Sequence, residues 1–249
     1  MAKILEVCVD SLASARNAIA GGADRLELCS ALTVGGLTPY TALLEQIREE
    51  LNIPVRCLMR PRGGDFLYTR AERELLCRQI RELKEAGADG FVIGCLTPDG
   101  VLDTEAMKPL VEACGDRGIT LHRAIDVSAD LQKTYRDAMA LGIDTVLTSG
   151  GAASCVNGMD AIRELIALRD SLKGPEVLIG AGVNAKVIAS FRREIPDARA
   201  FHMSGKTDIE SGMRFRRMDV PMGLPGLDEW HIQQTDPETV RSARAALDA

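Results

Sequence analysis

The chain has 249 residues, of which 46% are hydrophobic, and it carries a formal net charge of −6 at pH 7. This length suits one large domain or two small domains, and this hydrophobic content is enough for a substantial core. The negative charge, with Lys and Arg spread along the chain, argues against nucleic acid or an anionic membrane as a partner. No segment is apolar for long enough to span a bilayer, and no secretory signal opens the chain. Seven scattered cysteines suit free thiols in a reducing compartment, so we expect a cytoplasmic protein.

Short apolar runs alternate along the chain with longer segments of helical periodicity. The apolar runs predict eight strands, at residues 4–9, 25–29, 55–59, 90–93, 119–123, 145–148, 176–179 and 200–203. The periodic segments predict helices at residues 12–20, 38–51, 69–86, 104–114, 130–141, 159–168 and 185–191. We expect an irregular stretch at 205–235 and a last helix at 237–247.

A weak repeat supports this alternation. Gly22, Gly87 and Gly142 each end a helical pattern and are followed two residues later by Asp and a strand. A glycine at this place fits a left-handed helix C-cap. Eight strand–helix units predict an α/β fold, a closed (β/α)8 TIM-type barrel. We expect one domain over residues 1–249, with a barrel body at 3–204 and the irregular segment and final helix at 205–249. Whether residues 205–235 cover the barrel mouth is left open.

Polar side chains are expected inside this barrel, because side chains alternate across a strand. The first two strands then turn these residues inward: Glu6, Cys8, Asp10, Arg25, Glu27 and Cys29. The same parity turns these residues inward from later strands: Arg60, His122, His202 and Ser204.

Glu6 and Glu27 need partners if they are buried, since an isolated charge is costly to desolvate. Arg60, Arg62, His122 and His202 are the candidate partners. One interpretation is catalytic, with Glu6 or Glu27 as general acid or base and His122 as a proton shuttle. The other is an ion-pair network that only holds the barrel closed.

Cys8 and Cys29 are expected at matching heights near the tops of adjacent strands, which lie roughly 4.8 Å apart. Two thiolates at that spacing can hold Cu(I), a soft ion that favours sulfur. The alternative is that both cysteines are small buried hydrophobic side chains.

Several loops at the predicted strand ends have the composition of an anion site. The loop at 60–66 holds two arginines, Arg60 and Arg62, together with Asp65, and suits a clamp for a carboxylate or phosphate. Glycine-rich loops after the sixth, seventh and eighth strands contribute Ser149, Gly150, Gly180, Gly182, Ser204 and Gly205. Loops of this kind bind anions through backbone N–H groups, although tight turns also require glycine. With His202 nearby, we expect a small anionic ligand.

Seven segments resemble the CutC family of copper homeostasis proteins. They lie at residues 6–10, 22–29, 35–39, 60–66, 122–126, 146–150 and 211–215. The resemblance runs from about residue 4 to residue 223. It implies a TIM-type barrel, a cytoplasmic location, a homodimer or homotetramer, and copper homeostasis with Cu(I) at Cys8 and Cys29. It implies no reaction, so the residues leave an alternative open: a TIM-barrel enzyme acting on a small anionic or phosphorylated substrate.

Overall fold

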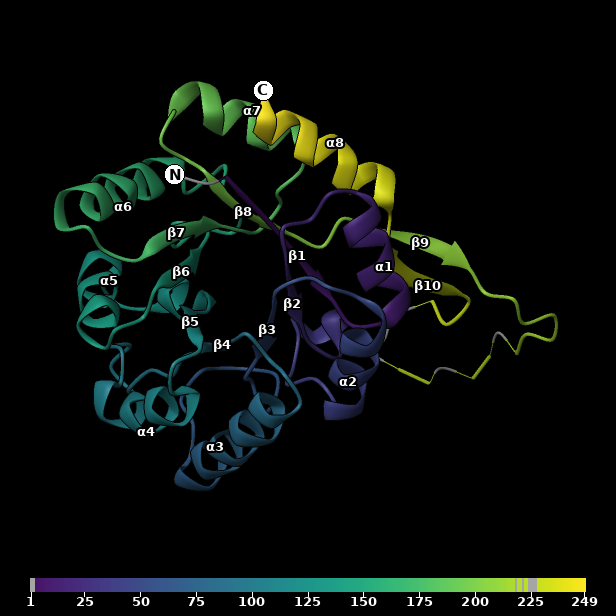
Figure 1. Ribbon diagram of the computed structural model, residues 1–249, viewed down its shortest axis with the longest axis horizontal. Coiled ribbons are helices and arrows are strands. Elements are labelled where there is room, and N and C mark those ends of the chain that lie inside the picture. The colour runs from purple at the N-terminus through teal and green to yellow at the C-terminus, as the bar shows by residue number, and fades with distance from the viewer. Residues whose placement is uncertain (1–2, 218, 221, 224–227) are drawn as a thin grey trace.

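The computed structural model describes residues 3–217, 219–220, 222–223 and 228–249. Eight parallel strands form a closed barrel in chain order, with β1 also paired to β8 (Figure 1). The strands are β1 (Ile4–Val9), β2 (Arg25–Leu28), β3 (Val55–Leu58), β4 (Gly90–Ile93), β5 (Gly118–Leu121), β6 (Thr145–Thr148), β7 (Glu176–Ile179) and β8 (Ala200–Met203). The predicted (β/α)8 TIM-type barrel is confirmed.

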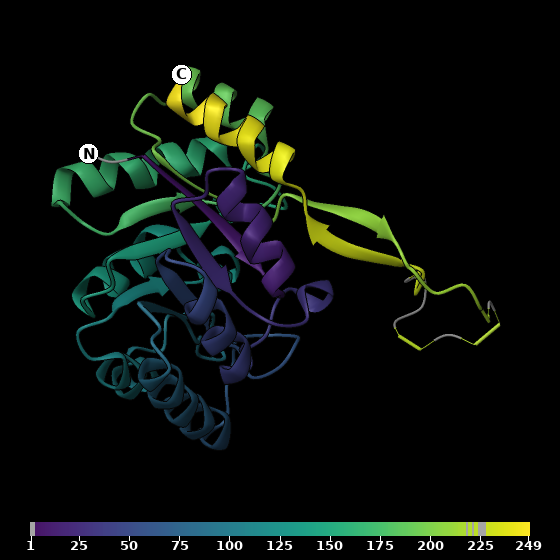
Figure 2. The same cartoon turned by 45° about the vertical axis from the view of Figure 1, so that its right-hand side comes forward.

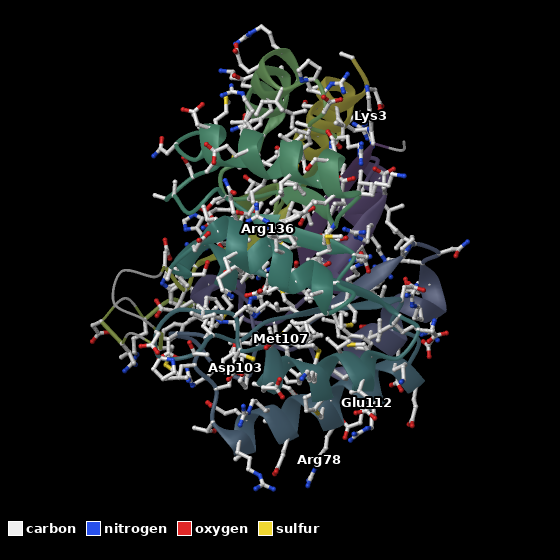
Figure 3. The ribbon with its side chains drawn as sticks, turned by 90° about the vertical axis from the view of Figure 1, so that its left-hand side faces the viewer. Lys3, Arg78, Asp103, Met107, Glu112 and Arg136 are labelled. Carbon is white, nitrogen blue, oxygen red and sulfur yellow. The ribbon has the colours of Figure 1, made fainter. Side chains whose placement is uncertain are left out.

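Eight α-helices among the described residues surround the strands. They are α1 (Leu12–Ala20), α2 (Thr41–Glu50), α3 (Arg70–Glu85), α4 (Thr104–Cys114), α5 (Leu131–Ala140), α6 (Met159–Leu172), α7 (Ala185–Glu194) and α8 (Pro237–Asp248). Figure 3 shows the charged outer faces of these helices, with Arg78, Glu112 and Arg136 at the surface. No helix within the described ranges is long and apolar enough to cross a membrane.

Local sequence signals set where the helices start and stop. Thr69 and Glu72 form a reciprocal capping box at the start of α3, which satisfies backbone N–H groups that have no helical acceptor. Gly22, Gly87 and Gly142 adopt φ angles of 94°, 98° and 78° after α1, α3 and α5. This left-handed conformation is strained for other residues, so the repeated glycine marks the predicted helix ends.

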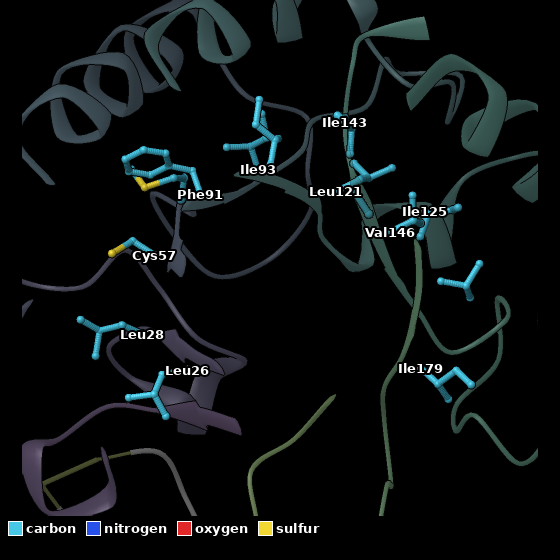
Figure 4. Close-up of a cluster of buried hydrophobic side chains, with 14 of the residues drawn as sticks. Leu26, Leu28, Cys57, Phe91, Ile93, Leu121, Ile125, Ile143, Val146 and Ile179 are labelled. Atoms are coloured by element: carbon cyan, nitrogen blue, oxygen red, sulfur yellow. The ribbon is translucent and has the colours of Figure 1, made fainter. Parts of the chain in front are cut away.

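The main hydrophobic core lies between the barrel and its helices. Leu5, Val7, Leu26 and Leu28 are fully buried there, as the alternation of the first two strands predicts. Figure 4 shows this layer, with Leu26 and Leu28 among side chains contributed by several strands. The opposite faces of the same strands therefore line the barrel lumen, where the polar residues lie.

The structure corrects three local predictions. The helix expected at 38–51 begins at Thr41, because a 3-10 helix, η1 (Leu32–Val34), and a Ser30–Leu37 bridge occupy the preceding residues. The fifth strand ends at Leu121 and is followed by a 3-10 helix, η2 (Arg123–Val127). The sixth helix runs on to Leu172 because no helix-breaking residue occurs before Lys173.

The segment at 205–235 is not irregular throughout, as the sequence led us to expect. It contains an antiparallel hairpin of β9 (Lys206–Glu210) and β10 (His231–Thr235). Figure 2 shows this ribbon extending away from the barrel between β8 and α8. Its inner end is anchored where the backbone N–H of Thr235 donates to the Ser14 hydroxyl on α1. The predicted segment also includes residues 218, 221 and 224–227, which lie outside the described residues.

Candidate functional site

Glu6 is the central carboxylate of the barrel lumen. The register of the sheet places Arg25 of β2 and His202 of β8 directly beside it. The Nε of Arg25 donates to Glu6 Oε2 at 2.5 Å, and Nδ1 of His202 lies 2.8 Å from Glu6 Oε1. Burial alone raises the pKa of Glu6, but Arg25 and His202 outweigh it and lower the pKa to about 2. Glu6 is therefore ionised at neutral pH.

Glu27 is the second buried carboxyl group, and its surroundings have the opposite effect. Burial raises its pKa to about 7, the charge of Glu6 adds to the rise, and His202 and Arg25 oppose it. Glu27 Oε2 lies 3.8 Å from His202 Nδ1 and has no hydrogen-bond partner among the described residues. One lumen thus holds a permanently ionised carboxylate and a carboxyl group that exchanges its proton near neutrality, the arrangement suited to acid–base chemistry.

His202 connects these two groups. Burial lowers its pKa, but the charges of Cys8 and Glu27 and the hydrogen bond to Glu6 raise it well above the usual value. Carboxylate oxygens of Glu6 and Glu27 and a ring nitrogen of His202 lie within 4.8 Å of one another, close enough to share a metal ion. The inward parity predicted for these three side chains is what the structure shows.

Cys8 and Cys29 do not lie at matching heights as expected. In the register of β1 and β2, Cys8 is opposite Glu27 and Val9 is opposite Leu28, so Cys29 lies two residues further along. Cys29 is fully buried against Leu58, and its Sγ lies 3.5 Å from the Val9 carbonyl oxygen. Burial raises the pKa of the Cys29 thiol well above its usual range, and the charge of Cys8 adds to this effect.

Cys8 is placed differently, because it lines two adjoining cavities in the barrel mouth beside His202. Neither cysteine belongs to a group of three or more metal-binding side chains within the described part of the chain. The two thiols are therefore diagonal neighbours on adjacent strands, with Cys8 at the cavities and Cys29 buried against Leu58.

The arginines of the 60–66 loop do not pair with the glutamates, contrary to expectation. Arg60 donates instead to the carbonyl oxygens of Val34, Gly36 and Gly64. Its guanidinium group has no acidic partner among the residues described.

Arg62 lies outside the lumen. It forms ion pairs with Asp65 and Glu72, which anchor the loop to the start of α3. Asp65 is exposed and so lies on the rim of the barrel. The arginine that pairs with a buried glutamate is Arg25, and not Arg60 or Arg62 as expected. Its position beside Glu6 depends on strand register and not on any local motif.

His122 caps η2 from a buried position at the end of β5. Its Nδ1 accepts a hydrogen bond from the backbone N–H of Ala124 at 3.2 Å, and it pairs with neither glutamate. Burial and the positive charge of Arg60 lower its pKa to about 3, so the imidazole is neutral. Its ring packs on Phe66, with ring centroids 4.7 Å apart.

The glycine-rich loop after β6 uses its own donors internally. The backbone N–H of Ser149 donates to both carboxylate oxygens of Asp126, and the N–H of Gly150 donates to the Thr148 hydroxyl. Arg123 joins this network through Asp126 and the Ser149 hydroxyl. The expected anion-binding N–H groups of Ser149 and Gly150 are thus occupied by Asp126 and by the Thr148 hydroxyl, and Asp126 is a residue that the loop composition did not single out.

The loops after β7 and β8 form the wider part of the barrel mouth. A cavity of about 290 Å³ is lined there by Cys8, Leu32, Gly35, Arg123, Ala181, Gly182, Val183, His202, Met203, Ser204 and Lys206. Gly180 and Gly205 lie beside this cavity and have structural contacts. The N–H of Gly180 donates to the Thr148 carbonyl, and a Cβ on Gly205 would meet Val240 at 3.0 Å.

A narrower cavity of about 120 Å³ adjoins the first. Its lining residues are Cys8, Glu27, Leu32, Gly35, Gly36, Leu58, Arg60, Phe66, His122, Arg123, Leu147 and His202. A larger hollow of about 720 Å³ lies between α3 and α4, but most of its lining consists of exposed or half-buried side chains of the outer surface. We take the lumen as the functional site, because the buried ionisable groups converge there.

These features define a (β/α)8 barrel with a thiol, a carboxyl group and two histidines lining its mouth, and with a second carboxylate, Glu6, buried beside His202. Residues 3–207 match the model of the CutC family. A mouse copper homeostasis protein cutC homolog is 41% identical over 244 residues, 97% of this chain and 88% of the relative. The human homolog is 40% identical over the same shares of the two chains.

A solved structure agrees with these sequence comparisons. The crystal structure of a Streptococcus agalactiae protein described as copper homeostasis protein CutC superposes with a TM-score of 0.76 at 27% identity. The superposition covers 81% of this chain and 98% of the Streptococcus agalactiae chain. The chain therefore belongs to the CutC family, as the seven sequence segments indicated.

Proposed function

We propose that this chain acts in copper homeostasis and binds one Cu(I) ion in the barrel mouth, with Cys8 and Cys29 as ligands. The observation that carries the proposal is that the two thiols are diagonal neighbours on the paired strands β1 and β2, with Cys8 lining the lumen cavities. Diagonal neighbours on paired strands lie roughly 7–8 Å apart at Cα, close enough for both side chains to meet at one ion. Sulfur is the donor type that Cu(I) prefers.

The surroundings of the thiols also support a Cu(I) cargo. All seven cysteines are free, which suits a reducing cytoplasm where copper is Cu(I). A coordinating thiol loses its proton when it binds the metal. Because the pKa of Cys29 is raised, protons compete with Cu(I) at this thiol, and the Cu(I) affinity should increase as pH rises. A cytoplasmic homodimer or homotetramer remains our prediction for the assembly, and light scattering on the purified protein measures it.

The experiment is an anaerobic Cu(I) titration against a competing chromogenic chelator. The unmodified chain should bind one ion, and the Cys8→Ser, Cys29→Ser double variant should lose it. A matched control is the Cys77→Ser, Cys114→Ser double variant, whose cysteines lie on the outer helices α3 and α4. Equal Cu(I) uptake by the Cys8 and Cys29 double variant rejects the proposal.

One further observation favours a second function: at the edge of the lumen, the Arg60 guanidinium group has no acidic partner within the described ranges. Together with the separated pKa values of Glu6 and Glu27, it supports an enzyme that binds a small anion and moves a proton on it. Calorimetric titration with a panel of small carboxylates and phosphates tests this function. Absence of binding by every anion in the panel rejects it.

A further inference from the structure

Three residues that line the narrower lumen cavity each carry a buried polar atom without a hydrogen-bond partner among the described residues. These atoms are Arg60 Nε, His122 Nε2 and Glu27 Oε2. Leaving such an atom unpaired is unfavourable, because it has lost its hydrogen bonds to water without gaining one in the protein. Three at one cavity are therefore a strong indication of a ligand that pairs with them. The volume of about 120 Å³ limits that ligand to a small molecule.

The hydrogen-bond role of His122 follows from its contacts. The Ala124 N–H donates to Nδ1, so Nδ1 carries a lone pair, and the neutral ring must carry its proton on Nε2. A Cβ on Gly94 would lie only 2.5 Å from His122 Cε1, so the ring packs closely against β4. His122 therefore holds one N–H donor, Nε2–H, in a fixed position beside the cavity that the residue lines.

Arg60 presents a second fixed donor. Its Nη1 and Nη2 atoms are engaged by the backbone carbonyls of Val34, Gly36 and Gly64, which leaves the Nε–H free. The guanidinium carbon lies 5.3 Å from the centroid of the Phe66 ring, the same ring on which His122 packs. Both donors therefore belong to residues that pack on Phe66 and line the same cavity, and the positive charge of Arg60 favours an anionic ligand there.

The rest of the wall restricts the ligand further. Leu58, Leu147 and Phe66 supply apolar surface, and the ionised Glu6 lies next to the site through His202. Negative and apolar neighbours disfavour a dianion such as a phosphate monoester. Glu27 Oε2 still requires a partner, and an oxygen on the carbon next to the anionic group would provide one, because a keto oxygen accepts and a hydroxyl donates a hydrogen bond.

We propose that this cavity binds a short monocarboxylate of the 2-oxo or 2-hydroxy acid class. Its carboxylate accepts hydrogen bonds from His122 Nε2 and Arg60 Nε, and its 2-oxygen pairs with Glu27. Its short carbon chain packs between Leu58 and Leu147. The inference rests on the anion-binding function proposed above and specifies the ligand class.

Calorimetry on the full chain tests the proposal with pyruvate, lactate, propionate and inorganic phosphate as probes. We expect one-to-one binding of pyruvate or lactate, at least about tenfold weaker binding of propionate, and a similar loss in the His122→Phe variant. The matched control is His231→Phe, which alters an exposed histidine on the hairpin and should bind like the unmodified chain.

Each contrary outcome has a distinct meaning. Phosphate binding tighter than pyruvate leaves the anion-binding function standing and overturns the carboxylate assignment. Propionate binding as tightly as pyruvate overturns the role of Glu27. Absence of binding by all four probes overturns the inference, and the wider panel then decides the anion-binding function. If His122→Phe fails to fold, ¹⁵N-histidine NMR of the unmodified chain replaces it: pyruvate must shift the Nε2–H resonance of His122, and an unmoved resonance refutes the contact.

Discussion

The buried neutral imidazole of His122 makes a quantitative prediction for stability against pH. The pKa of His122 is lowered to about 3 by burial and by the charge of Arg60, whereas an unfolded histidine titrates near about 6.5. Between these values the unfolded chain binds a proton that the folded chain does not. Acidification therefore favours unfolding, and the loss of stability grows as pH falls from about 6.5 toward about 3.

The size of this effect follows from the two pKa values. One pKa unit corresponds to about 1.4 kcal/mol. A pH of 5 lies about 1.5 units below the pKa of the unfolded histidine, whereas the folded histidine is still neutral at this pH. His122 therefore lowers the free energy of unfolding by about 2 kcal/mol at pH 5. Since a domain has only about 5–15 kcal/mol of stability, this single residue removes a measurable share.

The assay is urea unfolding at pH 7 and pH 5 for the unmodified chain and for His122→Gln. Glutamine does not titrate, and its amide oxygen can accept the hydrogen bond from Ala124 N–H. We expect the free energy of unfolding to fall by about 2 kcal/mol less in the variant between the two pH values. Other titrating groups are common to both proteins and cancel in this difference. An equal fall in both proteins would refute the neutral buried state of His122.

Three further changes probe the lumen. Glu6→Gln leaves Arg25 without its buried carboxylate and should cost about 3–5 kcal/mol in urea unfolding at pH 7; a loss below about 1 kcal/mol would contradict the ion pair. Burial raises the pKa of Glu27 to about 7, so ionisation of Glu27 opposes folding as pH rises. Between pH 5 and pH 7 the free energy of unfolding should therefore fall by about 2 kcal/mol less in Glu27→Gln than in the unmodified chain. Gly94→Ala should lower the free energy of unfolding by about 1–3 kcal/mol, because the added Cβ overpacks against the His122 imidazole. Gly212→Ala is the control, since a Cβ there meets open space and should leave stability unchanged. Equal melting temperatures for the two variants would count against the close contact at Gly94.

The barrel was predictable because its signals are local and repeated. Apolar runs, helical periodicity and the glycines that follow α1, α3 and α5 each report on a single segment. The hairpin of β9 and β10 was not predictable in this way. Its ten residues are mostly polar and exposed, and their pairing joins segments about twenty residues apart, so no short window shows it.

In the candidate site too, features that depend on a single segment were predictable and features that depend on the pairing of two segments were not. Alternation along each strand was enough to predict that Glu6, Glu27 and His202 face the lumen, because this property depends on one strand at a time. Strand register depends on how two strands slide against each other, and sequence alternation carries no information on it. The offset of Cys8 from Cys29 and the pairing of Glu6 with Arg25 both follow from register, and the sequence led us wrong on both.

The two proposed ligands should oppose each other. Cu(I) held by two thiolates leaves a net negative charge at Cys8 and Cys29, and a carboxylate held by Arg60 adds a second negative charge in the cavity that Cys8 lines. Cys8 and Glu27 are opposite each other on paired strands, so the two charges share one buried, poorly screened space. Saturating pyruvate should therefore weaken Cu(I) binding, and Cu(I) should weaken pyruvate binding by the same factor, since coupling between two sites is reciprocal. Titrations in both orders measure that factor, and a factor of one would show that the two ligands do not share the lumen.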